Sequence, residues 1–330
     1  MSGFSVLVTD TSWESTEREA AVLAEVGARL ILAETGQESE LISLVPEADA
    51  ILTCFAQVTP AVVAAGGRLK VIGRYGIGVD NIAVPDATAR GIPVTNVPAY
   101  CLDEVAEHVL GLIFCLGRRI HRYDSAVHRG DWSLVVDQPV HRIFGQTLGV
   151  VGFGKIGRTV ASRAQGLGMH VVAYDPRASD ATFVEAGVQR QDLLGLAGAS
   201  DFVTLHVPST PETEGMINAG FFAAMRPSAF LLNTARGAVL DQAALVDALA
   251  RDELAGAGLD VFVPERLAPE HPLITDPRVL ATPHVAFYSE ESLADLATKA
   301  AQNVADVLAG RRPPDTINPE VYGGGERAPE

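Results

Sequence analysis

Short apolar runs alternate with segments of helical periodicity along most of the chain. The apolar runs are rich in Val, Ile and Leu, which is typical of strands buried on both faces of a parallel sheet. Between them, apolar side chains recur three and four positions apart, and glycines follow several of these segments where a helix end favours a left-handed residue. The alternation predicts an α/β protein with parallel sheets and helical crossovers.

The alternation starts twice, which predicts two doubly wound domains. The first series has strands expected at residues 4–9, 29–33, 50–54, 70–73 and 94–96, with helices at 14–26, 38–44, 60–65 and 84–90. The second series has strands expected at 147–151, 170–174, 202–206, 230–233, 257–260 and 279–282, with one of its helices at 242–250. A chain of 330 residues is long for one hydrophobic core and long enough for two.

Two longer helical patterns flank the second series. Residues 101–129 predict the longest helix of the first half, and its apolar positions form a face wide enough to contact a second subunit as well: Val105, Val109, Leu112, Ile113 and Leu116. Residues 290–308 follow the last strand and predict a helix that returns to the first series. The first domain is then discontinuous, with residues 1–100 and 286–330, and the second domain, residues 101–285, is inserted into it.

Glycines 152, 154 and 157 follow the strand expected at 147–151 and open a helical pattern. This Gly-x-Gly-x-x-Gly arrangement between strand and helix is typical of dinucleotide binding, because the glycines allow a tight turn, close approach of a pyrophosphate and close helix packing. Asp175 ends the next strand, roughly 20 residues further on, where a carboxylate binds the adenosine ribose and repels a 2′-phosphate. We therefore predict NAD as the cofactor; taken alone, the glycines also fit a turn that needs them only for packing.

Composition and charge exclude several classes of partner. The formal net charge is −16, which argues against binding to nucleic acid or to an anionic membrane. The longest apolar stretch, Val109 to Gly117, is too short to span a bilayer, and the N-terminus carries no basic leader. Cys54, Cys101 and Cys115 lack metal-ligand spacing, so we expect reduced thiols, no metal and a cytoplasmic location.

Four ionisable side chains follow strands of the second series: Arg236, Asp260, Glu265 and His284. The carboxyl ends of parallel strands meet at one edge of a sheet, where ligands bind in such folds. Hydride transfer to a carbonyl needs a proton donor, usually His, and a fixed cation for the developing oxyanion. A capping arginine, a surface glutamate or a core histidine explains each residue alone, but their grouping predicts an active site.

Five stretches together resemble the D-isomer-specific 2-hydroxyacid dehydrogenase family: Gly73–Asp80, Val151–Gly157, Asn233–Gly237, Gly258–Phe262 with Glu265, and Thr282–His284. The resemblance covers Val71 to Asn318. It implies a Rossmann NAD-binding domain inserted in a flavodoxin-like substrate domain, a homodimer, and hydride transfer between NAD(H) and a small 2-hydroxy or 2-keto acid. It also implies that His284, paired with Glu265, is the general acid/base and that Arg236 binds the substrate carbonyl and carboxylate.

The resemblance implies two sets of binding residues. The cofactor set is Gly152, Phe153, Gly154, Lys155, Ile156, Gly157, Asp175, His206, Val207, Pro208, Thr213, Thr234, Ala235, Arg236, Asp260 and His284. The substrate set is Arg74, Tyr75, Gly76, Ile77, Gly78 and Phe287. Within these sets, Thr234 is expected near the nicotinamide ribose and Asp260 near the carboxamide. Backbone N–H groups of residues 76–78 are suited to a carboxylate, although their glycines also fit a simple tight turn.

An aromatic residue, Phe287, follows His284 by three positions, which is most similar to the subgroup that includes the C-terminal-binding-protein corepressors. Two alternatives to the small-acid dehydrogenase stay open. One is an NAD(H)-sensing dimeric scaffold of the corepressor kind, and the other is a phosphoglycerate or phosphonate dehydrogenase of the same family. The sequence does not identify the acid.

Overall fold

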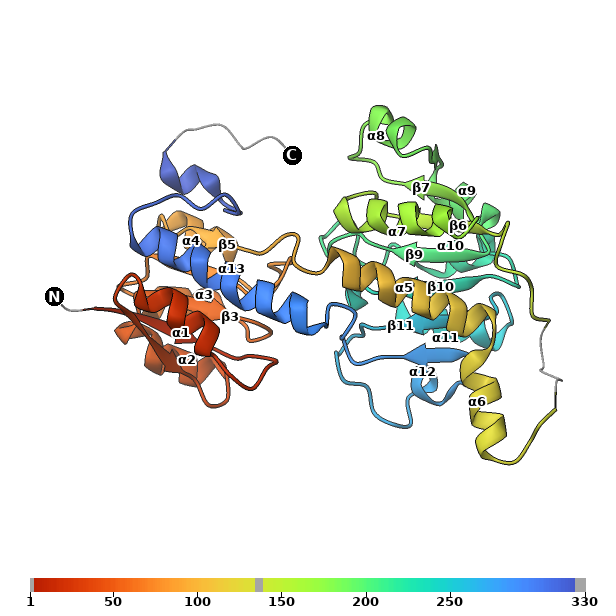
Figure 1. Ribbon diagram of the computed structural model, residues 1–330, viewed down its shortest axis with the longest axis horizontal. Helices are drawn as coiled ribbons and strands as arrows, with labels where there is room; N and C mark the ends of the chain where they lie inside the picture. The colour runs from red at the N-terminus through yellow and green to blue at the C-terminus, as the bar shows by residue number, and fades with distance from the viewer. Residues whose placement is uncertain (1–2, 134–138, 324–330) are drawn as a thin grey trace. The chain divides into compact units, whose positions relative to one another are not determined.

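The computed structural model describes residues 3–133 and 139–323. The chain forms two compact units, and each is built around one parallel sheet (Figure 1). Unit 1 comprises residues 1–100 and 289–330, and unit 2 comprises residues 101–288. Each unit is described by itself below.

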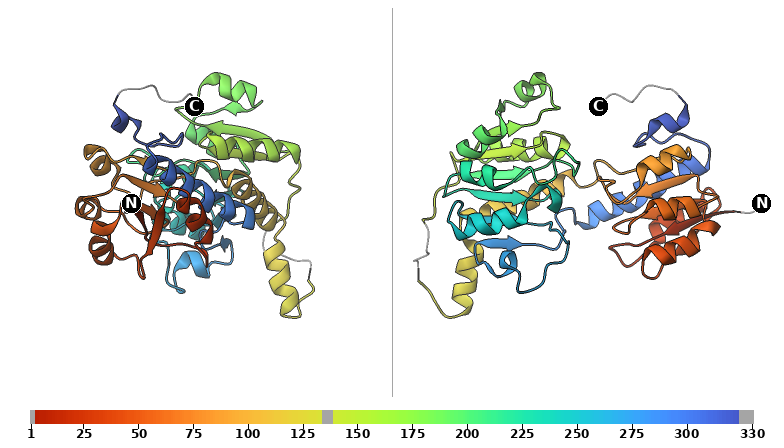
Figure 2. Two further views of the ribbon diagram at one scale, coloured as in Figure 1. Left: turned by 60° about the vertical axis from the view of Figure 1, so that its left-hand side comes forward. Right: turned by 180° about the vertical axis from the view of Figure 1, so that it is seen from behind.

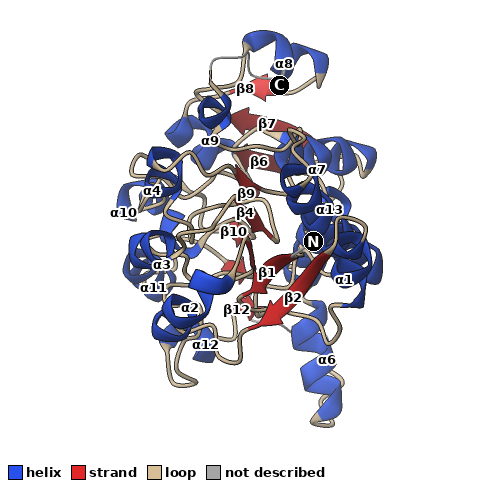
Figure 3. Ribbon diagram, turned by 90° about the vertical axis from the view of Figure 1, so that its left-hand side faces the viewer, coloured by secondary structure: helices blue, strands red, loops and turns tan. Residues whose placement is uncertain are grey.

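Unit 1 contains a five-stranded parallel sheet with helices on both faces (Figure 3). The strands are β1 (Phe4–Val8), β2 (Ala28–Leu32), β3 (Ala50–Thr53), β4 (Val71–Arg74) and β5 (Val94–Thr95), in the order β2-β1-β3-β4-β5. One face packs against α1 (Glu17–Ala24) and α13 (Glu290–Leu308), and the other against α2 (Glu38–Leu44), α3 (Pro60–Ala65) and α4 (Val84–Ala89). The short helices η1 (Val45–Glu47) and η3 (Pro319–Tyr322) complete the unit. This strand order is that of flavodoxin-like folds.

Unit 2 contains a seven-stranded parallel sheet in the order β12-β11-β10-β9-β6-β7-β8. The strands are β6 (Thr147–Val151), β7 (His170–Tyr174), β8 (Gln189–Arg190), β9 (Phe202–Leu205), β10 (Phe230–Asn233), β11 (Gly256–Leu259) and β12 (Val279–Ala281). One face packs against α5 (Leu102–Gly117), α7 (Lys155–Gly166) and α8 (Asp180–Glu185), and the other against α9 (Leu193–Ala199), α10 (Ala219–Ala224), α11 (Gln242–Ala250) and α12 (Pro272–Thr275). The remaining elements are α6 (Ile120–His128) and η2 (Gly237–Val239). Taken from its β8 end, the order β8-β7-β6-β9-β10-β11 is the doubly wound order of dinucleotide-binding domains. Strand β12 adds a seventh strand beside β11.

The predicted α/β class and the two parallel sheets are confirmed. The strand list omits β8, because Gln189 and Arg190 are both exposed and carry no apolar signal. Within residues 3–133 and 139–323, no helix combines the length and the apolar character that crossing a membrane requires.

The single helix predicted over residues 101–129 is wrong. The chain forms α5 and α6, separated at Arg119, whose φ of 56° lies in the left-handed region. The buried Arg119 guanidinium lies 4.9 Å from the centre of the Phe230 ring, a cation–π contact with the strand below. This contact between residues distant in sequence stabilises the break.

The apolar face of α5 is used inside unit 2, contrary to the expectation that it would also reach a second subunit. Val109, Leu112 and Ile113 pack against Leu148 and Val160 in one core. Helix α6, which is described throughout, has no buried residue and stands away from the body of unit 2 in both views of Figure 2.

Candidate active site

Three neighbouring strands of unit 2 place the predicted catalytic residues at one edge of the sheet. Strands β10, β11 and β12 are parallel, with Asn233 opposite Leu259 and Leu259 opposite Ala281. Arg236, Asp260 and His284 each follow these positions by one to three residues. The carboxyl edge of the sheet therefore carries a cation, a buried acid and an imidazole.

Asn233 and Gly237, for which the sequence pattern predicted no separate role, hold the turn that presents Arg236. The Asn233 amide donates to the Arg236 carbonyl at 2.9 Å and accepts from Ala235 N–H at 3.0 Å. A Cβ on Gly237 would lie 2.4 Å from the Phe262 carbonyl, so only glycine lets the loops after β10 and β11 approach this closely. The half-buried Arg236 side chain, which also donates to the Ala235 carbonyl, is thereby fixed beside the loop that leads to Glu265.

His284 and Glu265 form the ion pair that the resemblance implies. The imidazole Nδ1 lies 3.4 Å from Glu265 Oε2, and 24% of the His284 side chain is exposed, against 51% for Glu265. A carboxylate at Nδ1 fixes the tautomer and leaves Nε2 to exchange a proton with a substrate. The Phe287 ring meets the imidazole edge to face, with ring centres 6.3 Å apart.

The backbone at His284 is strained and held by Asp260. His284 has a φ of 57°, and a left-handed conformation costs a residue other than glycine about 1–3 kcal/mol. Its N–H donates to the Asp260 carbonyl at 2.8 Å. The buried Asp260 carboxylate accepts from the Thr282 hydroxyl at 2.6 Å and from the N–H groups of Val285 and Ala286 at 2.9 and 2.8 Å. Asp260 thus grips the turn on both sides of His284; its expected contact with nicotinamide stays a prediction.

The glycine loop after β6 has the shape that a dinucleotide needs. Gly152 has a φ of 92°, and a Cβ on Gly157 would lie 2.1 Å from the Gly152 carbonyl oxygen, so both positions exclude other residues. A Cβ on Gly154 would meet no atom within 4 Å, which leaves open space over the middle of the loop. Helix α7 starts at Lys155 without a side-chain cap, so its first N–H groups and its dipole suit a phosphate.

Two further residues of the predicted cofactor set fit that role. Asp175, at the end of β7, accepts from the N–H groups of Phe153 and Arg177, both at 2.8 Å, and so connects the strand end to the glycine loop. The Thr234 hydroxyl is buried and has no partner among the described residues. An orphaned donor at the edge that carries the glycine loop fits a site that a ligand completes.

The segment after β9 carries the rest of the set. Burial lowers the pKa of His206 to about 3, so its ring is neutral near pH 7, and Nε2 lies 3.0 Å from the Thr204 hydroxyl. Thr213 donates to the Pro208 carbonyl at 2.6 Å and closes the loop that starts at Val207. Ile156 is half-buried and packs against the core below α7.

The predicted substrate residues 74–78 lie in unit 1, at the end of β4 and directly after it. Arg74 is buried, and its Nε atom has no partner among the described residues. Gly76 has a φ of 148°, and a Cβ there would lie 3.1 Å from the Arg74 guanidinium. In the described structure the N–H groups of Ile77 and Gly78 donate no hydrogen bond, so this turn retains donors for an anion.

A second turn of unit 1 is filled by the chain itself. Asp10, after β1, accepts from the N–H groups of Cys54, Phe55 and Ala56 after β3, at 2.9, 2.6 and 3.2 Å. Ligands of this strand order bind where β1 and β3 diverge, and here a carboxylate of the protein occupies those donors. The N–H groups of this turn are therefore not available to an anion, unlike those of Ile77 and Gly78.

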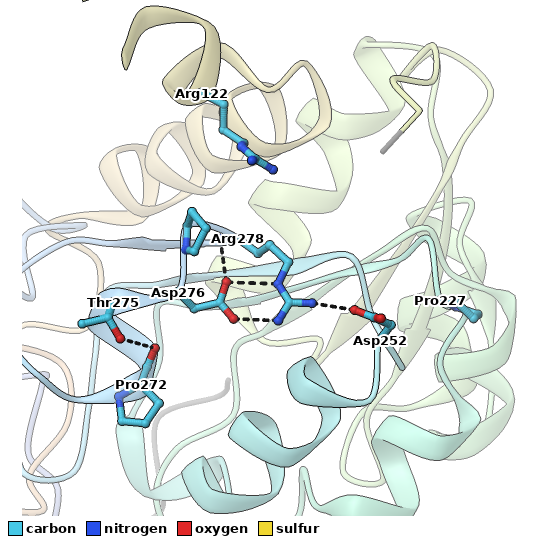
Figure 4. Close-up of a pocket in the computed structure, with 8 residues that line it drawn as sticks. Arg122, Pro227, Asp252, Pro272, Thr275, Asp276 and Arg278 are labelled. Carbon is cyan, nitrogen blue, oxygen red and sulfur yellow. Dashed lines mark hydrogen bonds and ion pairs between the residues drawn. The ribbon is translucent and has the colours of Figure 1, made fainter. Parts of the chain in front are cut away.

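A hollow of about 860 Å³ lies at the opposite, amino edge of the unit 2 sheet (Figure 4). Arg278, just before β12, donates to Asp276 at 2.7 Å and to Asp252 at 2.8 Å across it. Two carboxylates neutralise this cation, and no residue predicted for catalysis lines the hollow. Among the described residues, those predicted for catalysis therefore lie at the carboxyl edge of the sheet and not at this hollow.

Known proteins are similar to this chain in both sequence and fold. The family model for the NAD-binding domain of D-isomer specific 2-hydroxyacid dehydrogenases matches residues 110–286. A D-3-phosphoglycerate dehydrogenase from Synechocystis is 41% identical over 284 residues, which are 85% of this chain and 50% of that protein. A glyoxylate reductase from Korarchaeum cryptofilum is 38% identical over 285 residues, which are 85% of this chain and 86% of that protein.

Among solved structures, D-lactate dehydrogenase from Aquifex aeolicus, complexed with NAD and lactic acid, gives a TM-score of 0.84 at 28% identity. The match covers 99% of this chain and 100% of that one. The chain spans about half the length of the phosphoglycerate dehydrogenases that it matches.

Proposed function

Because the chain belongs to the D-isomer-specific 2-hydroxyacid dehydrogenase family, we propose that it transfers hydride between NAD(H) and a small 2-hydroxy or 2-keto acid. One observation carries the proposal: Arg236 and the His284–Glu265 pair follow neighbouring strands of the sheet that also carries the glycine loop. A cation, a proton donor and a dinucleotide loop at one edge are what ketoacid reduction requires.

Bound NADH supplies the hydride, and the side chains supply charge and a proton. The Arg236 guanidinium binds the carbonyl and carboxylate oxygens of the ketoacid and stabilises the negative charge that develops on the carbonyl oxygen. His284, as imidazolium, donates its Nε2 proton to that oxygen, and in the oxidation direction the neutral ring takes the proton back. Glu265 orients the ring through Nδ1 and balances its positive charge.

We propose that residues 101–285 form the NAD-binding domain and that residues 1–100 with 286–330 form the substrate-binding domain, of which 324–330 lie outside the described residues. Arg74 and residues 75–78 would bind the substrate, with Phe287 beside it. The described loops that follow the five strands of unit 1 contain no Lys or Arg, and Arg74 at the end of β4 is the buried cation beside them. With Arg236 assigned to the ketoacid carbonyl and carboxylate, Arg74 is the one further cation of the proposed substrate residues, which favours an acid without a phosphate group.

A panel of 2-keto acids with NADH consumption as the readout tests the proposal. The panel contains glyoxylate, pyruvate, hydroxypyruvate and 3-phosphohydroxypyruvate, the last because of the similarity to phosphoglycerate dehydrogenase. We expect turnover with at least one unphosphorylated acid and a lower kcat/KM for the phosphorylated one. Tight NADH binding without turnover on any acid would instead support an NAD(H)-sensing scaffold. The narrower likeness to the corepressor subgroup stays a prediction.

Asp175 is expected to set the preference for NADH. Asp175→Asn keeps an acceptor for the Phe153 N–H but removes the charge that repels a 2′-phosphate. The ratio of kcat/KM with NADPH to that with NADH should rise at least roughly tenfold, the equivalent of about 1.4 kcal/mol. Asp180→Asn, an exposed acid on α8, is the matched control and should leave the ratio unchanged. A wild-type protein that uses both cofactors equally would show that this strand end has been misinterpreted.

We propose a homodimer in which α6 lies at the interface. Ile120, Val127 and Trp132, on α6 and just after it, are 51%, 40% and 80% exposed, and grouped apolar side chains on a surface indicate a partner. Symmetric dimers are the commonest assembly. Light scattering should give about twice the 34.8 kDa of one chain.

The double variant Ile120→Asp, Val127→Asp should bring the mass to that of one chain. Val184→Asp, on the exposed surface of α8, is the matched control and should stay dimeric. A wild-type mass of one chain at micromolar concentration contradicts the proposal.

The cysteines bear on location. Cys54, Cys101 and Cys115 are all free thiols. Reduced thiols are typical of a reducing compartment, which supports our proposal of a cytoplasmic location.

A further inference from the structure

We propose that His108, on α5, is a positioning residue for the catalytic histidine. Through the Thr282 hydroxyl and the Asp260 carboxylate, it fixes the turn that carries His284. The inference rests on the proposed function for the role of His284. Its contacts lie within unit 2, and neither His108 nor the Thr282 hydroxyl was singled out from the sequence.

Helix α5 lies directly on β11, which places His108 over Asp260. A Cβ on Gly258 would lie 3.2 Å from the δ-carbons of Leu112, so glycine lets the helix approach the strand. Four residues of an α-helix rise about 6 Å, and two residues of a strand span about 6.6 Å. The step from Leu112 back to His108 therefore matches the step from Gly258 forward to Asp260.

A chain of hydrogen bonds runs from His108 on α5, through the Thr282 hydroxyl, to Asp260 at the end of β11. Thr282 Oγ1 lies 2.6 Å from Asp260 Oδ1 and 3.1 Å from His108 Nε2. The Asp260 carboxylate accepts two backbone N–H groups as well, so all three of these hydrogen bonds use it as an acceptor. The single hydroxyl proton of Thr282 thus goes to Asp260, and the oxygen accepts from His108. This network assigns the proton to Nε2 of His108.

Asp260 binds residues on both sides of the strained His284. Asp260 binds Thr282 before His284 and both Val285 and Ala286 after it, so one carboxylate orientation defines the turn. His108 and Thr282 hold that orientation from the side of α5. Without them the carboxylate is free to rotate, and His284 leaves its left-handed conformation. The glycine loop follows a different strand, β6, and stays in place, so NADH affinity should change little even though Asp260 is expected near the nicotinamide carboxamide.

Two pairs of variants test this chain of contacts. Thr282→Val removes the hydroxyl while keeping the shape, and His108→Phe removes the donor while keeping a ring. We expect kcat for ketoacid reduction to fall about tenfold in the first and about threefold in the second. KM and the NADH Kd should stay within about twofold. Thr282→Ser and His108→Gln, which restore the hydroxyl and the donor, should return kcat to within about twofold of the wild type.

Controls remove the same groups elsewhere. Thr298→Val deletes an exposed hydroxyl that bonds only to its own helix α13, and His170→Phe changes an exposed ring at the start of β7. Both should keep wild-type kcat. Thermal melts establish that all six proteins fold.

Hydrogen exchange at the Val285 and Ala286 amides gives a readout that needs no substrate. Exchange at both should become about tenfold faster in Thr282→Val and recover in Thr282→Ser. If the wild type reduces no ketoacid, the proposed function fails, and exchange still decides whether His108 and Thr282 hold the turn. Wild-type kcat and exchange in both Thr282→Val and His108→Phe would overturn the inference. So would a Thr282→Ser variant as impaired as Thr282→Val, because the loss would then not come from the hydroxyl.

Discussion

His284→Ala should lower kcat for ketoacid reduction by roughly 10²–10⁴, the usual contribution of a positioned acid, while the NADH Kd stays within about twofold. In the proposed mechanism the imidazole, which lies beside the Glu265 carboxylate, is the proton donor at this edge. Removing it leaves Arg236 to stabilise an alkoxide that must take its proton from water. In the proposed function the glycine loop after β6 makes the main contact with the dinucleotide, so its affinity should change little.

Steady-state kinetics on the best acid of the panel and a fluorescence titration with NADH separate the two effects. His170→Ala, an exposed histidine at the start of β7, is the matched control and should keep full turnover. Near-normal turnover in His284→Ala would remove His284 from the mechanism and leave it a residue of the turn after β12. A parallel loss of NADH affinity would show that the ring mainly supports the cofactor.

Site residues that are marked by the local sequence pattern around them could be predicted. The glycine loop is a local signal, because one strand, three glycines and one helix suffice to define it. Arg236, Asp260 and His284 could be found because each ends an apolar run, and parallel strands bring such ends together. The strained φ of His284 carried no signal, since it depends on the Asp260 carboxylate below the turn.

Residues that act through distant packing could not be predicted. His108 meets Thr282 across 174 positions of sequence, and the contact exists only because α5 crosses β11 at Gly258. At the break between α5 and α6, Arg119 stacks on Phe230, a contact that a helical pattern does not reveal. Similarly, a strand-end acid such as Asp10 looks available for a ligand, but it is bound to the turn after β3.

Arg236→Gln should raise KM for the ketoacid at least roughly tenfold and lower kcat by about 10²–10³, the usual loss when a fixed oxyanion donor is removed. Both parameters change because the guanidinium holds the ground-state carboxylate and the charge that develops on the carbonyl oxygen. Asn233 and Gly237 fix the turn that carries it, so the donor is in place before the substrate arrives. Arg236→Lys should recover only a small part of the activity, because a point charge does not match two oxygens as a planar fork does.

The division between KM and kcat decides which role dominates. A rise in KM with kcat unchanged would mean that Arg236 binds substrate and transition state equally and contributes only to uniform binding. Arg226→Gln, which breaks an exposed ion pair with Asp201 at the other end of the same strand, controls for loss of charge and should change neither parameter. Because the Asn233 amide sets the Arg236 backbone, Asn233→Ala should reproduce part of the kcat loss while the guanidinium is still present. A deficit of that kind arises only if the orientation of the cation, and not its charge alone, lowers the barrier.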